Sequence, residues 1–322
     1  MSFAHEDREF ADLLRIVAED RGVVPALVEK DYWVTHTLWA LQEQGLELWF
    51  KGGTSLSKGF GIIHRFSEDL DLKIEAGTAS GIPVVGNWKS LANGAIAMRR
   101  SFFDSLQRFV RVPGASTELD LSMDPKLRSA GMRVLYPGIH VVDIAHPFRP
   151  FVLLEIGHAR VVPFLRRDLS SFVHDHLRQL GVLTDYDQNC PRGVRCVHPM
   201  VTLLEKLDAI ARRFAKGAAA ATFVRHFEDA ARIIECLVDL PPIDSHAEAR
   251  DLVLEMAEER QIVGVPAAND EAFLPDDSDR WSGVRAAYRS IAPMFWGDRV
   301  SLEGACEAIR GWVVSNLGDP SS

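Results

Sequence analysis

Two aspartates, Asp69 and Asp71, stand two residues apart in the segment DLDLKI at residues 69–74. The segment predicts a strand, and on a strand this spacing projects both carboxylates from the same face. Such a pair can hold one or two Mg²⁺ ions together with the phosphate oxygens of a substrate. The pattern therefore points to transfer chemistry on a metal-bound polyphosphate.

A glycine pair precedes the aspartates in the sequence GGTSLSK. Gly52 and Gly53 permit close backbone approach just before a predicted helix, whose free N-terminal amide groups favour phosphate. Thr54 and Ser55 can add hydroxyl donors, and Lys58, one turn further on, can reach the phosphates or the acceptor backbone. Nucleotidyl transfer needs such a set, because in-line attack on an alpha-phosphate requires a held triphosphate, a metal and an oriented acceptor.

A third carboxylate is offered by Glu155, which lies in an otherwise apolar predicted strand where a charge is costly without a use. Asp120 and Asp143 also lie in strand-like segments, and a buried ion pair would explain Glu155 equally well, so these alternatives stay open. Ser67 precedes Asp69 by two residues and should point to the same side.

The elements that must position these residues follow from apolar periodicity and turn residues. Strands are expected at residues 46–50, 69–74, 117–123, 132–136, 140–144 and 151–156. Helices are expected at residues 8–20, 25–43, 91–110, 168–180, 200–215, 221–238, 246–259, 281–292 and 300–314, with a short one from about Thr54. The pattern predicts an α+β protein, with a mixed-sheet domain over residues 1–165 and an all-helical domain over residues 166–322.

Four segments together carry a family resemblance. FKGGTSLSK and RFSEDLDL resemble motif I of the polymerase-beta superfamily, and more specifically the AbiEii and MenT-type toxins of bacterial abortive-infection and toxin-antitoxin systems. VEKDYWVTHTLWAL at residues 28–41 resembles the helix that leads into this motif in that family. LLEKLDAIARR at 203–213 and RHFEDAARI at 225–233 resemble its later motifs, so the similarity spans about residues 25–240.

This resemblance implies a polymerase-beta-like nucleotidyltransferase core that uses Mg²⁺. It implies that Lys206 contacts the nucleotide phosphates, that Asp229 completes the active site, and that the Ser67 hydroxyl touches phosphate or is a site of regulatory phosphorylation. The implied reaction moves a nucleoside monophosphate from an NTP to RNA, at the 3′ end of the tRNA acceptor stem, and the implied partner is a cognate antitoxin. A protein or small-molecule acceptor, and a catalytically silent protein that only binds a partner, remain alternatives.

Charge along the 322 residues is uneven. The net charge is -9, and residues 239–280 hold twelve acids against three arginines, so the rest of the chain is neutral overall. A phosphate-binding face is therefore compatible with the negative total. The two basic stretches that could form it are Arg99, Arg100, Arg108 and Arg111, and Lys206, Arg212, Arg213, Lys216, Arg225 and Arg232.

The cellular setting follows from what the sequence contains. Four cysteines are too few for a disulfide scaffold in a chain this long. The N-terminal MSFAHEDREFADLL has no signal-peptide pattern, and no apolar run approaches membrane-spanning length. We therefore expect a cytoplasmic protein without a membrane partner. The sequence has neither a GxSxG elbow nor a Walker A pattern, which argues against the common hydrolase and P-loop classes.

Overall fold

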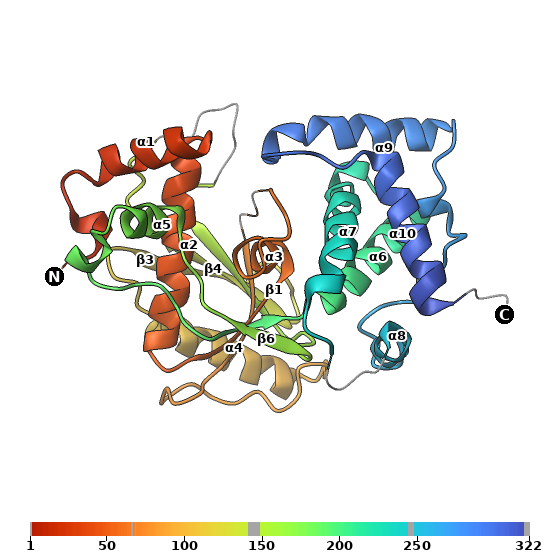
Figure 1. Cartoon of the computed structure of the whole chain (residues 1–322). Coiled ribbons are helices and arrows are strands. Elements are labelled where there is room, and N and C mark those ends of the chain that lie inside the picture. The colour runs from red at the N-terminus through yellow and green to blue at the C-terminus, as the bar shows by residue number, and fades with distance from the viewer. Residues whose placement is uncertain (1, 66, 68, 141–148, 244–247, 319–322) are drawn as a thin grey trace. The chain divides into compact units, whose positions relative to one another are not determined.

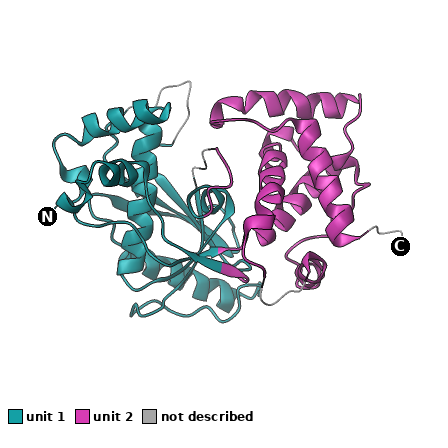
Figure 2. Ribbon diagram, viewed as in Figure 1, with its two compact units in different colours: residues 1–59, 67–161, 165–196 teal, residues 60–66, 162–164, 197–322 magenta. Residues whose placement is uncertain are grey.

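The computed structural model describes residues 2–65, 67, 69–140, 149–243 and 248–318 (Figure 1). The chain forms two compact units, which Figure 2 distinguishes by colour. The first unit comprises Met1–Gly59, Ser67–Val161 and Leu165–Cys196, and the second comprises Phe60–Phe66, Val162–Phe164 and Val197–Ser322. The chain thus passes between the units five times. The expected division into domains of residues 1–165 and 166–322 stays a prediction.

The first unit is built on a mixed sheet of seven strands in the order β3-β4-β5-β2-β1-β7-β6. Central β2 pairs antiparallel with β1 and parallel with β5. On the far sides, β1 pairs parallel with β7, and β4 pairs antiparallel with both β3 and β5. The strands are β1 Glu47–Lys51, β2 Asp69–Glu75, β3 Ser116–Asp120, β4 Ser129–Leu135, β5 Val152–Gly157, β6 Phe164–Arg167 and β7 Val194–Val197.

Strand β2 shows that one face of the sheet is apolar and the other is polar. Leu70, Leu72 and Ile74 are buried, whereas the alternating residues that start with Asp69 and Asp71 are partly exposed. This period-two pattern places the apolar side chains in the core and leaves the aspartates on the opposite, polar face.

Helices α1, α2 and α5 of the first unit lie against one another (Figure 1), and α2 also contacts β1 and β5. Buried residues occur on all sides of α2, which explains why the helix has little amphipathic character. Pro25 stands in its first turn, where a missing amide hydrogen costs nothing. The helices of this unit are α1 Phe10–Arg21, α2 Pro25–Glu43, α3 Gly52–Lys58, α4 Asn93–Phe109 and α5 Phe172–Gln179.

The second unit is helical from Pro199 onward, with α7 packed against both α6 and α10. Its core includes Leu207, Phe227 and Trp281, all buried. Its helices are α6 Pro199–Ala215, α7 Arg225–Cys236, α8 Ala249–Glu258, α9 Asp279–Ser290 and α10 Leu302–Leu317. Short 3-10 turns in the two units are η1 Ala4–Glu6, η2 Leu183–Asp185, η3 Ala220–Thr222, η4 Leu237–Asp239, η5 Glu271–Phe273 and η6 Ala292–Met294.

The α+β class and the mixed sheet expected from the sequence are confirmed. Strands β6 and β7 were not predicted, and β7 interrupts the half of the chain that was expected to be all-helical. Each has only four residues, too few for a clear period-two pattern. The strand expected at 140–144 falls largely on residues outside those described. Within the described ranges, none of the helices is both long enough and apolar enough to cross a bilayer.

Candidate active site

Three carboxylates share the polar face of the sheet in the first unit. Asp69 and Asp71 lie on β2, and the register pairs Asp71 with Glu155 of the parallel neighbour β5. Directly paired residues project to the same side of a sheet, so Glu155 stands beside the aspartate pair. On the other side, Asp71 pairs with Lys51 of β1.

The electrostatics of Glu155 reflect this crowding. Burial, followed by the negative charges of Asp71 and Asp69, raises the pKa of Glu155 to about 7, while Arg149 opposes the shift. Arg149 also lies 3.6 Å from Asp69 Oδ1. Carboxylates held this close repel one another when ionised, and a cation placed between them would relieve the repulsion.

The alternatives to Glu155 are placed differently. Asp120 lies in the same row across the sheet but two strands beyond Glu155, with Gly131 of β4 between them. Its carboxylate accepts a hydrogen bond from Arg133 at 2.6 Å. Asp143 lies outside the described residues. Of the two described acids, the structure therefore places Glu155, and not Asp120, next to Asp71.

The glycine pair fits tightly against the aspartates. Gly52 has a φ of 74°, a left-handed conformation that disfavours side chains, and a Cβ at this position would overlap the carboxylate of Asp71. Gly53 follows it, buried in the first turn of α3. The absence of a side chain at residue 52 thus lets Asp71 occupy its position.

Thr54 and Ser55 are turned into the protein. The Thr54 hydroxyl, on a residue only 3% exposed, reaches the carbonyl oxygens of Asp69 at 2.7 Å and Ser67 at 3.1 Å. It therefore ties α3 to the start of β2. Ser55 is buried as well, and Ser67 is half-buried.

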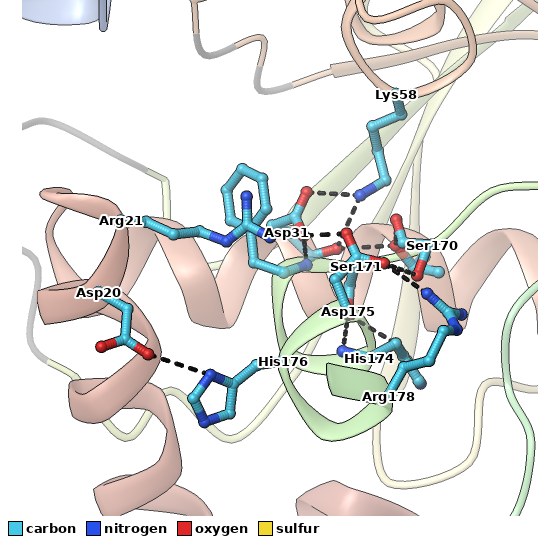
Figure 3. Close-up of polar contacts among 12 residues, drawn as sticks. Asp20, Arg21, Asp31, Lys58, Ser170, Ser171, His174, Asp175, His176 and Arg178 are labelled. Carbon is cyan, nitrogen blue, oxygen red and sulfur yellow. Dashed lines mark hydrogen bonds and ion pairs between the residues drawn. The ribbon is translucent and has the colours of Figure 1, made fainter. Parts of the chain in front are cut away.

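Lys58, at the end of α3, forms an ion pair with Asp31 of α2, which Figure 3 shows beside the first turn of α5. Lys58 Nζ lies 2.5 Å from Asp31 Oδ1, and Asp31 Oδ2 accepts a hydrogen bond from the Phe172 amide at 2.8 Å. One carboxylate thus connects α2, α3 and α5. Sequence analysis did not single out Asp31 for this role, although an acid inside a helix as apolar as α2 was an available signal.

A second charged cluster lies in the second unit. Lys206 of α6 donates to Asp229 Oδ2 of α7 at 2.7 Å. Arg65 Nε and Nη2 donate to Asp229 Oδ1 and Oδ2 at 2.7 and 2.8 Å. Burial alone would raise the pKa of Asp229, but Arg65 and Lys206 hold it well below its ordinary value. Burial lowers the pKa of Lys206, with a contribution from Arg65 in the same direction.

The residues expected at the site therefore form two groups, each described within its own unit. The first contains Asp69, Asp71 and Glu155 together with the positioning contacts of Gly52 and Thr54. The second contains Lys206 and Asp229. Sequence analysis missed Arg65 because its partner Asp229 is 164 residues away.

Comparison with known proteins assigns the family. The model of a family described as nucleotidyl transferase AbiEii toxin, type IV toxin-antitoxin system, matches residues 37–302. Among solved structures, the nucleotidyltransferase toxin MenT4 from Mycobacterium tuberculosis H37Rv is similar, with a TM-score of 0.49, 18% identity, and coverage of 94% of this chain and 99% of that one. None of the curated proteins compared with the chain matches it. Because the family match spans well over half of the 322 residues, the chain belongs to the AbiEii family of nucleotidyltransferase toxins of type IV toxin-antitoxin systems.

Proposed function

We propose that this nucleotidyltransferase moves a nucleoside monophosphate from an NTP to the 3′ end of RNA, specifically the tRNA acceptor stem, with Mg²⁺. The row formed by Asp69, Asp71 and Glu155 is the observation that supports the proposal. In this reaction the RNA 3′ hydroxyl oxygen forms a bond to the alpha-phosphorus, and the bond to pyrophosphate breaks. Because its proposed substrates are cytoplasmic molecules, we place the reaction in the cytoplasm.

The three carboxylates suit a hard divalent cation. Burial and the charges of Asp71 and Asp69 raise the pKa of Glu155, which is the effect expected where negative charges gather on one face of a sheet. Among the described residues, no three acidic, histidine or cysteine side chains are arranged so that they could hold a metal ion together, so these carboxylates would have to rearrange around one. Mg²⁺ is usually held by one or two carboxylates together with substrate phosphates, and it keeps several waters, which suits an open set of this kind. When bound, the ion would neutralise charge on the transferring phosphate.

The remaining residues would position this centre. Gly52 leaves room for Asp71, and Thr54 holds the backbone of Asp69. We propose that the backbone around Gly52, Gly53 and Ser55 faces the phosphates, with Ser67 beside it. The ammonium of Lys58 pairs with Asp31, and its expected contact with the phosphates stays a prediction.

From the second unit, we propose that Lys206 contributes positive charge to the triphosphate. Its Nζ is buried beside Asp229, where a charge interacts more strongly than in water. The type IV family implies a cognate antitoxin, and we propose that neutralisation by this partner controls the activity.

Incubation of the purified chain with each labelled NTP, Mg²⁺ and total RNA tests the proposal. We expect label in tRNA, and at least about a hundredfold less with Asp69→Asn or Asp71→Asn, since a metal carboxylate supports several kcal/mol of charge stabilisation. Glu118→Gln, which removes a carboxylate from β3, should transfer normally. Label found in protein rather than RNA would show that the acceptor is a protein. Undiminished transfer by both aspartate variants would show that these carboxylates take no part in the reaction.

A further inference from the structure

Asp31 belongs to a run of three buried charged residues in α2, Glu29, Lys30 and Asp31, which are 2%, 1% and 8% exposed. Successive residues of a helix point about 100° apart, so the three side chains face different surroundings. Glu29 accepts hydrogen bonds from two backbone amides of the segment after β4, at 2.9 and 3.1 Å. Lys30 donates one to the carbonyl of Arg149, before β5, at 3.0 Å. The run thus connects α2 to several segments of the first unit, and Asp31 supplies the connection to α3.

The pair that Asp31 forms with Lys58 is buried and balanced in charge. The side chains of Lys58 and Asp31 are 9% and 10% exposed. Within the described ranges, each is the other's only partner in an ion pair. The second carboxylate oxygen, Oδ2, accepts the Phe172 amide at 2.8 Å, in the first turn of α5 that Figure 3 shows beside the pair. Removal of either charge would leave the other buried and uncompensated, which is costly.

Helix α3 has only seven residues, too few to be stable without contacts at its ends. At its start, Gly52 packs against Asp71 so closely that an added Cβ would overlap the carboxylate. The Thr54 hydroxyl donates to the Asp69 carbonyl at 2.7 Å. Thr54 and Lys58 are one turn apart, about 6 Å along the helix axis, so a shift at the end of α3 also moves its start. The pair at the end of α3 therefore affects both aspartates of β2.

We propose that Asp31 is a positioning residue for nucleotidyl transfer: by holding Lys58 it fixes α3, which in turn keeps the aspartates of β2 in place. Asp31 does not touch substrate in this role, because Lys58 and the Phe172 amide engage its two oxygens. The role differs from the expected phosphate contact of Lys58. Loss of a positioning contact lowers kcat, whereas loss of a phosphate contact that is equally strong in the ground state raises the KM for NTP. The inference rests on the proposed function for the reaction that is measured, but the hold on α3 can be tested without substrate.

The test compares Asp31→Asn, Lys58→Met and the variant that carries both changes. Asparagine keeps an acceptor for the α5 amide, and methionine keeps most of the buried stem of the lysine. We expect each variant to lower kcat for transfer of labelled nucleotide to RNA at least about tenfold, because misplacement by about 1 Å can cost about a hundredfold. The KM for NTP should stay within about twofold, and the double variant should be no slower than either single one, because all three break the same link.

The control is Asp175→Asn, which changes an acid of the same cluster (Figure 3). Asp175 lies on α5 and is bonded to Ser170 and Arg178 at 2.7 and 2.8 Å, so its loss should leave transfer unchanged.

Thermal unfolding of the same variants separates positioning from support of the fold. Each single change leaves a buried charge unpaired and should lower Tm, whereas the double variant has no unpaired charge and should recover most of the loss. If Asp31 only supports the fold, kcat recovers together with Tm in the double variant, and that result would overturn the inference. Normal transfer by Asp31→Asn, with Lys58→Met raising only the KM for NTP, would also overturn it.

If the unsubstituted chain labels no RNA, the proposed function fails, and hydrogen exchange tests the hold on α3 alone. We expect the amides of residues 52–58 to exchange about tenfold faster in both single variants, with exchange in α4 unchanged, because the local opening of α3 becomes easier. Unchanged exchange in α3 would show that Asp31 does not fix this helix.

Discussion

A single methyl group at residue 52 would reach the carboxylate of Asp71. We predict that Gly52→Ala greatly reduces nucleotidyl transfer, because Asp71 must move away and the left-handed backbone is strained by about 1 to 2 kcal/mol. Gly81 provides a matched control, since it has a similar φ of 83° but an added Cβ would meet nothing within 4 Å. Transfer assays and thermal unfolding of both variants separate the two effects. Both should lose the stability that the strained left-handed backbone costs, and equal activity in both would contradict the role of Gly52.

Single residues differ in how far the sequence alone could place them. The strand period was sufficient to put Asp69 and Asp71 on one face, and an isolated acid in an apolar strand indicated Glu155. The ion pair of Lys58 could not be foreseen in this way, because its partner Asp31 lies on a different helix. Local spacing fixes which residues share a face, whereas ion-pair partners depend on how the elements pack.

Helix α2 buries a polar network that makes the first unit sensitive to acid. Asn189 donates to Tyr32 Oη at 3.0 Å and to His36 Nδ1 at 2.8 Å, and His36 Nε2 lies 3.0 Å from the Pro113 carbonyl oxygen. Both contacts suit a neutral ring whose proton is on Nε2. Burial, as the largest cause, lowers the pKa of His36 to about 4.

This network predicts a pH dependence of stability. In the unfolded chain the His36 ring takes up a proton near pH 6.5, whereas in the folded chain its pKa is lowered to about 4. The free energy of unfolding should therefore be highest above about pH 6.5 and fall as the pH drops toward 4, by roughly 3 kcal/mol from this group. Urea unfolding at pH 7.5 and 5 measures the change.

The control for this prediction keeps the hydrogen bonds but removes the titration. In His36→Gln the amide can still donate and accept, so the difference between the two pH values should shrink. His64→Gln, at an exposed histidine, should behave as the unsubstituted chain. A full pH dependence in His36→Gln would assign the acid sensitivity to other groups.

At the scale of elements, long periodic segments were the most predictable. Helix α2 occupies the residues expected from the sequence, Pro25–Glu43, because a proline opens it and an apolar run sustains it. The four-residue strands β6 and β7 were missed, although β-branched Val194 and Val197 lie between Gly193 and Pro199. Such short strands are stabilised by the neighbour they pair with, here β1 for β7, and a single sequence does not reveal that neighbour.

Across the whole molecule, the second unit depends on a segment from early in the chain. Residues 60–66 belong to it, and they supply the Arg65 partner of Asp229. We predict that a fragment of residues 197–322 alone is much less stable than the same unit in the full chain, because Asp229 would keep only Lys206. Circular dichroism during thermal unfolding measures this. A cooperative transition at the temperature of the intact protein would show that the segment is dispensable.

The same interleaving orders events while the protein is being made. The ribosome releases Arg65 long before Asp229, which is 164 residues further along. Because synthesis adds about 5 to 20 residues per second, roughly 10 to 30 s pass between the synthesis of Arg65 and that of Asp229. The strands that carry Asp69, Asp71 and Glu155 emerge during that interval, whereas α6 and α7 emerge only near its end. A nascent chain thus contains Asp69, Asp71 and Glu155 well before Asp229 can join Arg65 and Lys206, and the completed toxin arises only once α7 has left the ribosome.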